Sequence, residues 1–179
     1  MQASTSGIST VLDRRQDSLA VPLEEALAGH HSSPSQGRGL RDTARAMAEE
    51  NIEIVRRFFD AYNRGDFEAT LDLIAPEFEF RPSGLFMDTE GTYHGREGWS
   101  EFWSTFQAAW ESITVDLERI EDLGDQVLTL GTFQGKGRGS GVAVTREVAW
   151  LGTLRDGMLA QSLTFVGWAD AIEAAGLSE

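Results

Sequence analysis

Residues 58–67 read FFDAYNRGDF, a stretch in which four aromatic side chains flank a polar corner at residues 63–66. Upstream of this corner, apolar side chains recur at helical spacing, at Ile52, Val55, Phe59 and Tyr62. Gly65 can adopt the left-handed backbone conformation that commonly ends a helix. The sequence therefore predicts a helix that ends at this corner.

A second helix is predicted to begin at the same corner. Asp66 is of a residue type preferred at helix N-caps, and Pro76 would stop the helix. The apolar face between these two positions consists of Phe67, Leu71 and Ile74. We expect the two helices to enclose an apolar interior where their aromatic residues meet.

The rest of the chain predicts a third helix and a set of strands. Gly95 to Trp110 reads as a helix with one wide aromatic face, made of Trp99, Phe102, Trp103, Phe106 and Trp110. Beyond it the apolar period changes to two, which is typical of strands. The predicted strands are Ile113 to Ile120, Gln126 to Phe133, Val142 to Leu154 and Met158 to Val166, with turns at residues 123–125, 135–141 and 156–157. A short strand at Glu77 to Arg81, an irregular loop at Pro82 to Gly91 and a last helix at Asp170 to Ala175 complete the prediction. Helices followed by a meander of strands indicate an α+β fold.

Composition and charge limit the classes of partner. The chain has 179 residues, of which 41% are hydrophobic and 25% charged, as in a soluble globular protein with one domain. The net charge of -14 argues against a nucleic-acid or anionic-membrane partner, which would need a field of Lys and Arg. No apolar run approaches the ~18 residues that span a bilayer, and the first residues lack a secretory pattern. The absence of cysteine excludes disulfides and thiolate chemistry, and we place the protein in the cytoplasm by default.

The first 46 residues differ in composition from the rest. They are rich in Ser, Gly and Gln, and residues 29–37 read as a flexible linker. We predict a flexible tail at residues 1–46 and a folded domain at residues 47–179. An equally open interpretation is that Met47 is the natural start and the upstream stretch is incidental.

Several segments together resemble the SnoaL-like family of the nuclear transport factor 2-like superfamily, also called ketosteroid-isomerase-like. The segments are IVRRFFDAYNRGD at residues 54–66, PEFEF at 76–80, YHGREG at 93–98, LRDG at 154–157 and AIEAAGL at 171–177. The resemblance extends from about Glu49 to the end, so residues 47–179 would form a SnoaL-like domain. It implies a cone-shaped, curved antiparallel sheet wrapped around three N-terminal helices, also described as a cystatin-like α+β barrel, with a ligand pocket inside.

The resemblance also implies pairing of two chains through the convex face of the sheet. Both alternations of the predicted strands are apolar, with Leu128, Leu130, Ala149, Leu151, Leu163 and Phe165 on one and Val127, Thr129, Phe133, Val148, Trp150, Thr164 and Val166 on the other. Exposed apolar patches above a few hundred Å² are rare in monomers. We therefore expect a homodimer, with cover by the tail or by the third helix as the alternative.

The catalytic groups of the family's steroid isomerases have no counterpart in this chain. Those enzymes use a carboxylate base with a tyrosine and a protonated carboxylic acid as oxyanion donors. The resemblance places the tyrosine position at Phe58 and the base position at Arg81 or Pro82, and residues 148–154 contain no Asp or Glu. The family's polyketide cyclases place an aspartate base on what looks like the same strand. Neither activity is therefore expected without a different acid-base pair.

Four residues are the remaining catalytic candidates, namely Tyr62, Glu79, Arg81 and His94. Glu79 and Arg81 share one side of their strand, either as an ion pair in the cavity or as a solvent-facing pair. His94 could titrate near neutrality or bond to backbone at the rim. Tyr62 could present its hydroxyl to a ligand or to a buried carbonyl.

The predicted pocket is apolar and largely aromatic. Its expected lining is Phe58, Tyr62, Trp99, Trp103, Phe133, Arg146, Trp150, Thr164 and Val166, with Arg146 at the wet rim and Trp168 as a further aromatic candidate. We expect no metal and no other cofactor, because the domain has one histidine and the chain no cysteine. Three functions stay open: a small-molecule enzyme of isomerase, cyclase or epoxide-hydrolase type, a non-catalytic binder of a small apolar or aromatic metabolite, and a dimerising scaffold with a filled interior.

Overall fold

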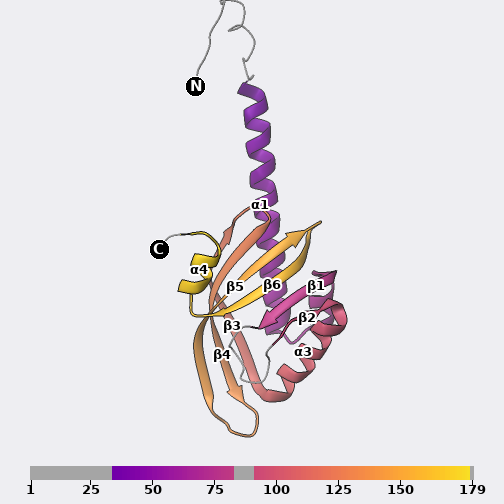
Figure 1. The fold of residues 1–179 in the computed structure, drawn as a ribbon, viewed down its shortest axis with the longest axis vertical. Helices are drawn as coiled ribbons and strands as arrows, with labels where there is room; N and C mark the ends of the chain where they lie inside the picture. Colours follow the sequence, from indigo (N-terminus) through magenta and orange to yellow (C-terminus); the bar gives the residue numbers. More distant parts are fainter. Residues whose placement is uncertain (1–33, 83–90, 178–179) are drawn as a thin grey trace, which may run out of the picture.

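A curved, unclosed six-stranded sheet holds the fold together in the computed structural model, which describes residues 34–82 and 91–177 and side chains from residue 38 (Figure 1). The elements are α1 (Pro34–Asn63), α2 (Phe67–Leu71), β1 (Ile74–Pro82), β2 (Tyr93–His94), α3 (Gly95–Ala109), β3 (Trp110–Asp122), β4 (Gln126–Gly137), β5 (Ala143–Arg155), β6 (Met158–Val166) and α4 (Ala169–Ala174). The α+β prediction is confirmed. None of the described helices is both long and apolar enough to span a membrane.

The sheet order is β2-β1-β6-β5-β4-β3. Strands β3 to β6 form the antiparallel meander that the sequence predicts. The expectation of a wholly antiparallel sheet is wrong at one place, because β1 runs parallel to β6. This pairing joins strands far apart in the chain, and no local pattern indicates its direction.

The corner at residues 63–66 forms as predicted. Gly65 has a φ of 69°, and the amide of Asp66 donates to the carbonyl of Ala61 at 2.9 Å. The side chain of Asp66 then accepts from the amide of Ala69 at 3.1 Å and caps α2. One glycine and one aspartate therefore end α1 and begin α2.

Helix α2 is shorter than predicted. It ends at Leu71, and Ile74 and Pro76 belong to β1 rather than to the end of a helix. Ile74 pairs with Leu159 of β6, and the register of the pair shifts between Ile74 and Glu79. Pro76 lies within this irregularity, where a missing N–H removes no regular ladder bond. Long-range pairing thus overrides the local helical pattern.

Helix α1 begins at Pro34, so the predicted flexible tail is helical from residue 34 onward. Residues 38–47 of the helix are exposed and extend beyond the sheet in Figure 1. The remainder of the predicted tail, including most of its linker at residues 29–37, lies outside the described residues. The start of the folded domain at residue 47 stays a prediction.

Two asparagines fasten the second half of α1 to β3. The side chain of Asn63 donates to the carbonyl of Val115 and accepts from its amide, both at 2.8 Å. Asn51 donates to Asp122 and to the carbonyl of Gly124, both at 2.9 Å. These contacts fix α1 across the concave face of the sheet.

Strands β3 and β4 run further than the sequence predicts. Trp110 pairs with Gly137, so the stretch that reads as a hairpin end at residues 135–141 begins within β4. The Trp110 ring packs on Gly135, where a Cβ atom would lie 2.6 Å from its Cε3. Glycine is therefore needed here for close packing of the indole ring, which a turn pattern does not reveal.

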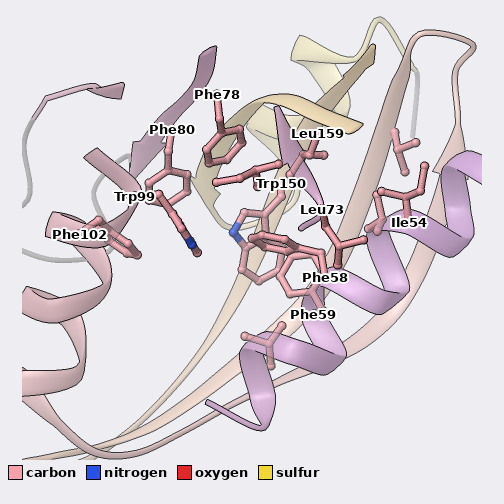
Figure 2. Close-up of a cluster of buried hydrophobic side chains, with 14 of the residues drawn as sticks. Ile54, Phe58, Phe59, Leu73, Phe78, Phe80, Trp99, Phe102, Trp150 and Leu159 are labelled. Atoms are coloured by element: carbon pink, nitrogen blue, oxygen red, sulfur yellow. The ribbon is translucent and has the colours of Figure 1, made fainter. Parts of the chain in front are cut away.

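The two faces of the sheet bury separate apolar clusters. The larger cluster fills the space between the concave face, α1 and α3 (Figure 2). The smaller one lies under α4 and contains Leu128, Leu130, Ala149, Leu151 and Ala171.

Each residue of this smaller cluster is at most 4% exposed in the single chain. Helix α4, rather than the third helix, therefore covers this part of the convex face in the described residues. A homodimer through the convex face stays a prediction.

Candidate functional site

An interior cavity of about 30 Å³ lies between α1, α3 and the concave face of the sheet. Its lining consists of Phe58, Phe59, Tyr62, Phe80, Pro82, Trp99, Phe102, Val115, Phe133, Trp150, Ser162 and Thr164. Helices α1 and α3 contribute aromatic rings, and the strands contribute the remaining walls. These side chains together form an aromatic enclosure.

The rings of this enclosure pack closely against one another (Figure 2). Phe59 and Trp150 have ring centroids 4.7 Å apart, and Phe80 and Phe102 have centroids 4.6 Å apart. A second cavity, of about 10 Å³, is also lined by Phe59 and Trp150. A dry cavity that accepts benzene is about 150 Å³. With its rings in these positions the interior is therefore too small for a ring-sized ligand, and residues 34–82 and 91–177 enclose no ligand-sized hollow there.

Strand β6 supplies two hydroxyl groups to the cavity. Ser162 and Thr164 both line it, because residues two apart in a strand face the same side. Thr164 is 1% exposed, and its Oγ1 is buried without a hydrogen-bond partner among the described residues. A buried hydroxyl without a partner is unfavourable, so this oxygen marks a polar point in an apolar wall.

Tyr62 is the least buried residue of the lining. Its ring meets the ring of Trp103 edge-on at 5.4 Å. The residue as a whole is half-buried, yet burial raises the pKa of its hydroxyl above the ordinary value of 10.0. Tyr62 is therefore a neutral hydroxyl at physiological pH and is unsuited to act as a base.

The wall formed by Trp99 is held in place by a buried hydrogen bond. Its Nε1 donates to Oγ1 of Thr70 at 3.0 Å, and that hydroxyl donates to the carbonyl of Phe67 at 2.6 Å. The indole N–H of Trp99 is thus already engaged, so this residue offers a ligand only its ring surface.

The other catalytic candidates lie outside the cavity lining. Glu79 and Arg81 form an ion pair of 3.0 Å on the side of β1 opposite to Phe80, with side chains 27% and 53% exposed. Glu79 also accepts from Gln161, and His94 is an exposed residue at the start of α3. The solvent-facing alternative for the Glu79 and Arg81 pair is the one that the structure supports.

Three predicted pocket residues also lie outside the lining. The ring of Trp103 packs edge-on against Tyr62, whereas Arg146 and Val166 are exposed near strand ends. Trp168 belongs to the cluster under α4, where its Nε1 donates to the carbonyl of Gly131. Lining residues that the pocket prediction omitted are Phe59, Phe80, Pro82, Phe102, Val115 and Ser162. The alternation of β1 and β6 could have identified Phe80 and Ser162.

The cavity lining, taken over the described part of the chain, contains no carboxylate, imidazole, ammonium or guanidinium group. Such a site can pack an apolar molecule and form hydrogen bonds through hydroxyl groups. It supplies no residue of ordinary acid-base strength near neutral pH.

Comparison with known proteins agrees with this fold. The SnoaL-like domain matches residues 55–162, which is more than half of the chain. The chain belongs to the SnoaL-like domain family. No curated protein matches its sequence.

Solved structures of similar fold share little sequence with this SnoaL-like chain. TerC, co-crystallised with polyporic acid, has a TM-score of 0.61 and 22% identity, covering 71% of this chain and 98% of its own. A putative SnoaL-like polyketide cyclase from Jannaschia sp. CCS1 has a TM-score of 0.58 and 21% identity, covering 74% and 95%. An M. tuberculosis LEH-like epoxide hydrolase has a TM-score of 0.57 and 18% identity, covering 72% and 91%. At these identities the likeness shows the fold and not the activity.

Proposed function

We propose that this chain binds a small, uncharged, ring-containing molecule in the interior enclosed by α1, α3 and the concave face of the sheet. The observation that carries the proposal is a lining of aromatic and aliphatic side chains with a few hydroxyls and no charged group in the described residues. Ligand sites of this kind are mostly apolar, with few polar groups that fix orientation. The names of the similar structures, which include a polyketide cyclase and a complex with polyporic acid, are consistent with a small-molecule site.

A ligand of ring size must displace part of the lining, because the cavity holds only about 30 Å³. Tyr62 is half-buried whereas the other lining residues are buried, so moving its ring outward costs the least packing. On this proposal, Tyr62 must rearrange for the ligand to bind. The free energy of that rearrangement lowers the apparent affinity.

We propose binding without chemical conversion. A general base must lie within hydrogen-bond reach of the proton that it removes. Glu79 and Arg81 point away from the interior, and His94 is at the surface. An isomerase, cyclase or hydrolase would need a base that the described lining does not provide.

Tryptophan fluorescence tests the binding proposal, since Trp99 and Trp150 both line the cavity. Titration with 1-indanone, a neutral bicyclic ketone, should give a saturable change, and chromatography should recover the ketone unaltered. No saturable change would contradict binding, and a converted product would contradict the absence of catalysis.

A cavity-filling variant supplies the matched control. Val115→Leu adds a methylene group to the lining and should weaken binding. Thr114→Ser changes the neighbouring residue of β3, which is exposed and faces the other side, and should leave binding unchanged. Equal loss in both variants would show that the effect does not arise inside the cavity.

The small cavity volume favours a second candidate function, that of a scaffold whose interior is filled by its own side chains. On this alternative neither 1-indanone nor a smaller neutral probe such as benzene binds, and Val115→Leu raises the thermal stability without another effect. Saturable binding of either probe inside the enclosure would reject the scaffold.

A further inference from the structure

We infer that the ligand presents a hydrogen-bond acceptor oxygen to Thr164, with Ser162 as its neighbour, and is therefore a neutral carbonyl compound rather than a hydrocarbon or an ion. This inference rests on the proposed binding function. It assigns Thr164 as the residue that determines which neutral ligands the enclosure prefers.

The first step concerns the hydroxyl of Thr164. A hydroxyl group has one proton to donate, and burial without an acceptor leaves that proton unused. Oγ1 of Thr164 is in this state among the described residues. Thr70, which is buried to the same degree, instead donates to Phe67 and accepts from Trp99. Two threonines that are equally buried thus differ, because only Thr70 has hydrogen-bond partners for its hydroxyl among the described residues.

The second step concerns the position of Thr164 in the sheet. It pairs with Trp150 of β5 on one side and with Pro82 of β1 on the other, and all three residues line the cavity. Ser162 follows along the same face of β6. A ligand that stacks on the wall beside Trp150 therefore has its edge next to hydroxyl donors of β6.

The third step concerns charge. A carboxylate ligand would be buried without a cation, and burying an unpaired charge is strongly unfavourable. An ammonium ligand would find aromatic faces but no carboxylate in the lining, and it would leave the hydroxyl proton of Thr164 unused. A neutral ligand with a carbonyl oxygen satisfies the hydroxyl and keeps the enclosure free of charge.

The experiment compares 1-indanone with indane, which has the same ring system without the carbonyl oxygen, and with tetramethylammonium. Wild-type protein should bind 1-indanone about 3- to 10-fold more tightly than indane, the range of one neutral hydrogen bond. Thr164→Val should remove this preference, and Thr164→Ser, which keeps a hydroxyl, should retain most of it.

A second readout separates this role from a structural one. Thr164→Val removes a buried hydroxyl without a partner, so the ligand-free protein should melt about 2 to 6 °C higher than wild type. A hydroxyl that stabilises the fold would give the opposite sign. Ser162→Ala serves as a control for the removal of a neighbouring hydroxyl from the same face.

The outcomes distinguish the two levels of the proposal. Equal affinity for 1-indanone and indane, or a preference that survives in Thr164→Val, overturns the assignment of Thr164 while leaving the binding function in place. Tighter binding of tetramethylammonium than of 1-indanone overturns the neutral ligand class. Failure of all three probes to bind overturns the binding function and this inference with it.

Discussion

Replacing Asn63 tests how the corner at residues 63–66 positions α1 on the sheet. Its side chain satisfies both the amide and the carbonyl of Val115, at 2.8 Å each, and Val115 is 2% exposed. Asn63→Ala leaves both backbone groups without this partner. Unsatisfied buried groups cost about 1 to 3 kcal/mol each, and water reaching the exposed position of Asn63 reduces that cost. We expect the free energy of unfolding to fall by about 2 to 4 kcal/mol, measured by urea denaturation with tryptophan fluorescence.

Asn63→Asp makes the same prediction sensitive to pH. The carboxylate can still accept from the amide of Val115, but it repels the carbonyl to which Asn63 donates. A protonated carboxyl group donates like the amide, so the loss relative to wild type should be large at pH 7 and smaller near pH 4. The adjacent, exposed Arg64 is the control, and Arg64→Ala should change stability by less than about 0.5 kcal/mol. A loss below about 1 kcal/mol in Asn63→Ala, or no pH dependence in Asn63→Asp, would refute the reasoning.

Three further perturbations have defined outcomes. Above about pH 10 the unfolded chain loses the Tyr62 proton that the folded chain retains, so the stability of the wild-type protein should fall with rising pH. Tyr62→Phe should reduce this fall when denaturation is measured as a function of pH. An identical pH profile in the variant would contradict burial of the hydroxyl. Phe58→Ala removes a buried ring from the main cluster and should lower the free energy of unfolding, measured by urea denaturation, by about 3 to 5 kcal/mol. Leu40→Ser, at a position that is 74% exposed, should lower it by less than about 0.5 kcal/mol. Equal effects of the two substitutions would contradict the described burial. Ending the chain after Gly167 removes α4 and uncovers Leu128 and Leu151. Sedimentation velocity should then detect more self-association than in the full chain. An unchanged distribution of sedimentation coefficients would show that α4 does not cover these residues.

The local signals at the corner were sufficient to predict its structure. Gly65 supplies the positive φ and Asp66 the cap, and both act within five residues of their own position. The helix at Gly95 to Ala109 and the strand at Met158 to Val166 were equally legible from their periods. Signals of short range thus predicted most elements and the α+β class.

Features that depend on distant residues were not predictable in this way. Ile74 joins a strand because Leu159, far along the chain, pairs with it. Part of the convex face is covered by α4, whose apolar stripe is too short to indicate where it packs.

The candidate site shows the same limit. Helical spacing and the resemblance pointed to Phe58, Tyr62 and Trp99, and strand alternation pointed to Phe133, Trp150 and Thr164. These six residues lie around one interior. It could not give the cavity volume, because that depends on how rings from different elements interlock. Arg146 and Val166 follow the inward alternation, but both are exposed near the ends of their strands.

A crystal structure of the protein grown with 1-indanone tests the central claim most directly. The account predicts the ketone inside the enclosure, its oxygen within hydrogen-bond distance of Oγ1 of Thr164 and the ring of Tyr62 displaced outward. An empty interior with every lining ring in its ligand-free position, at a ketone concentration that saturates any fluorescence change, would contradict it.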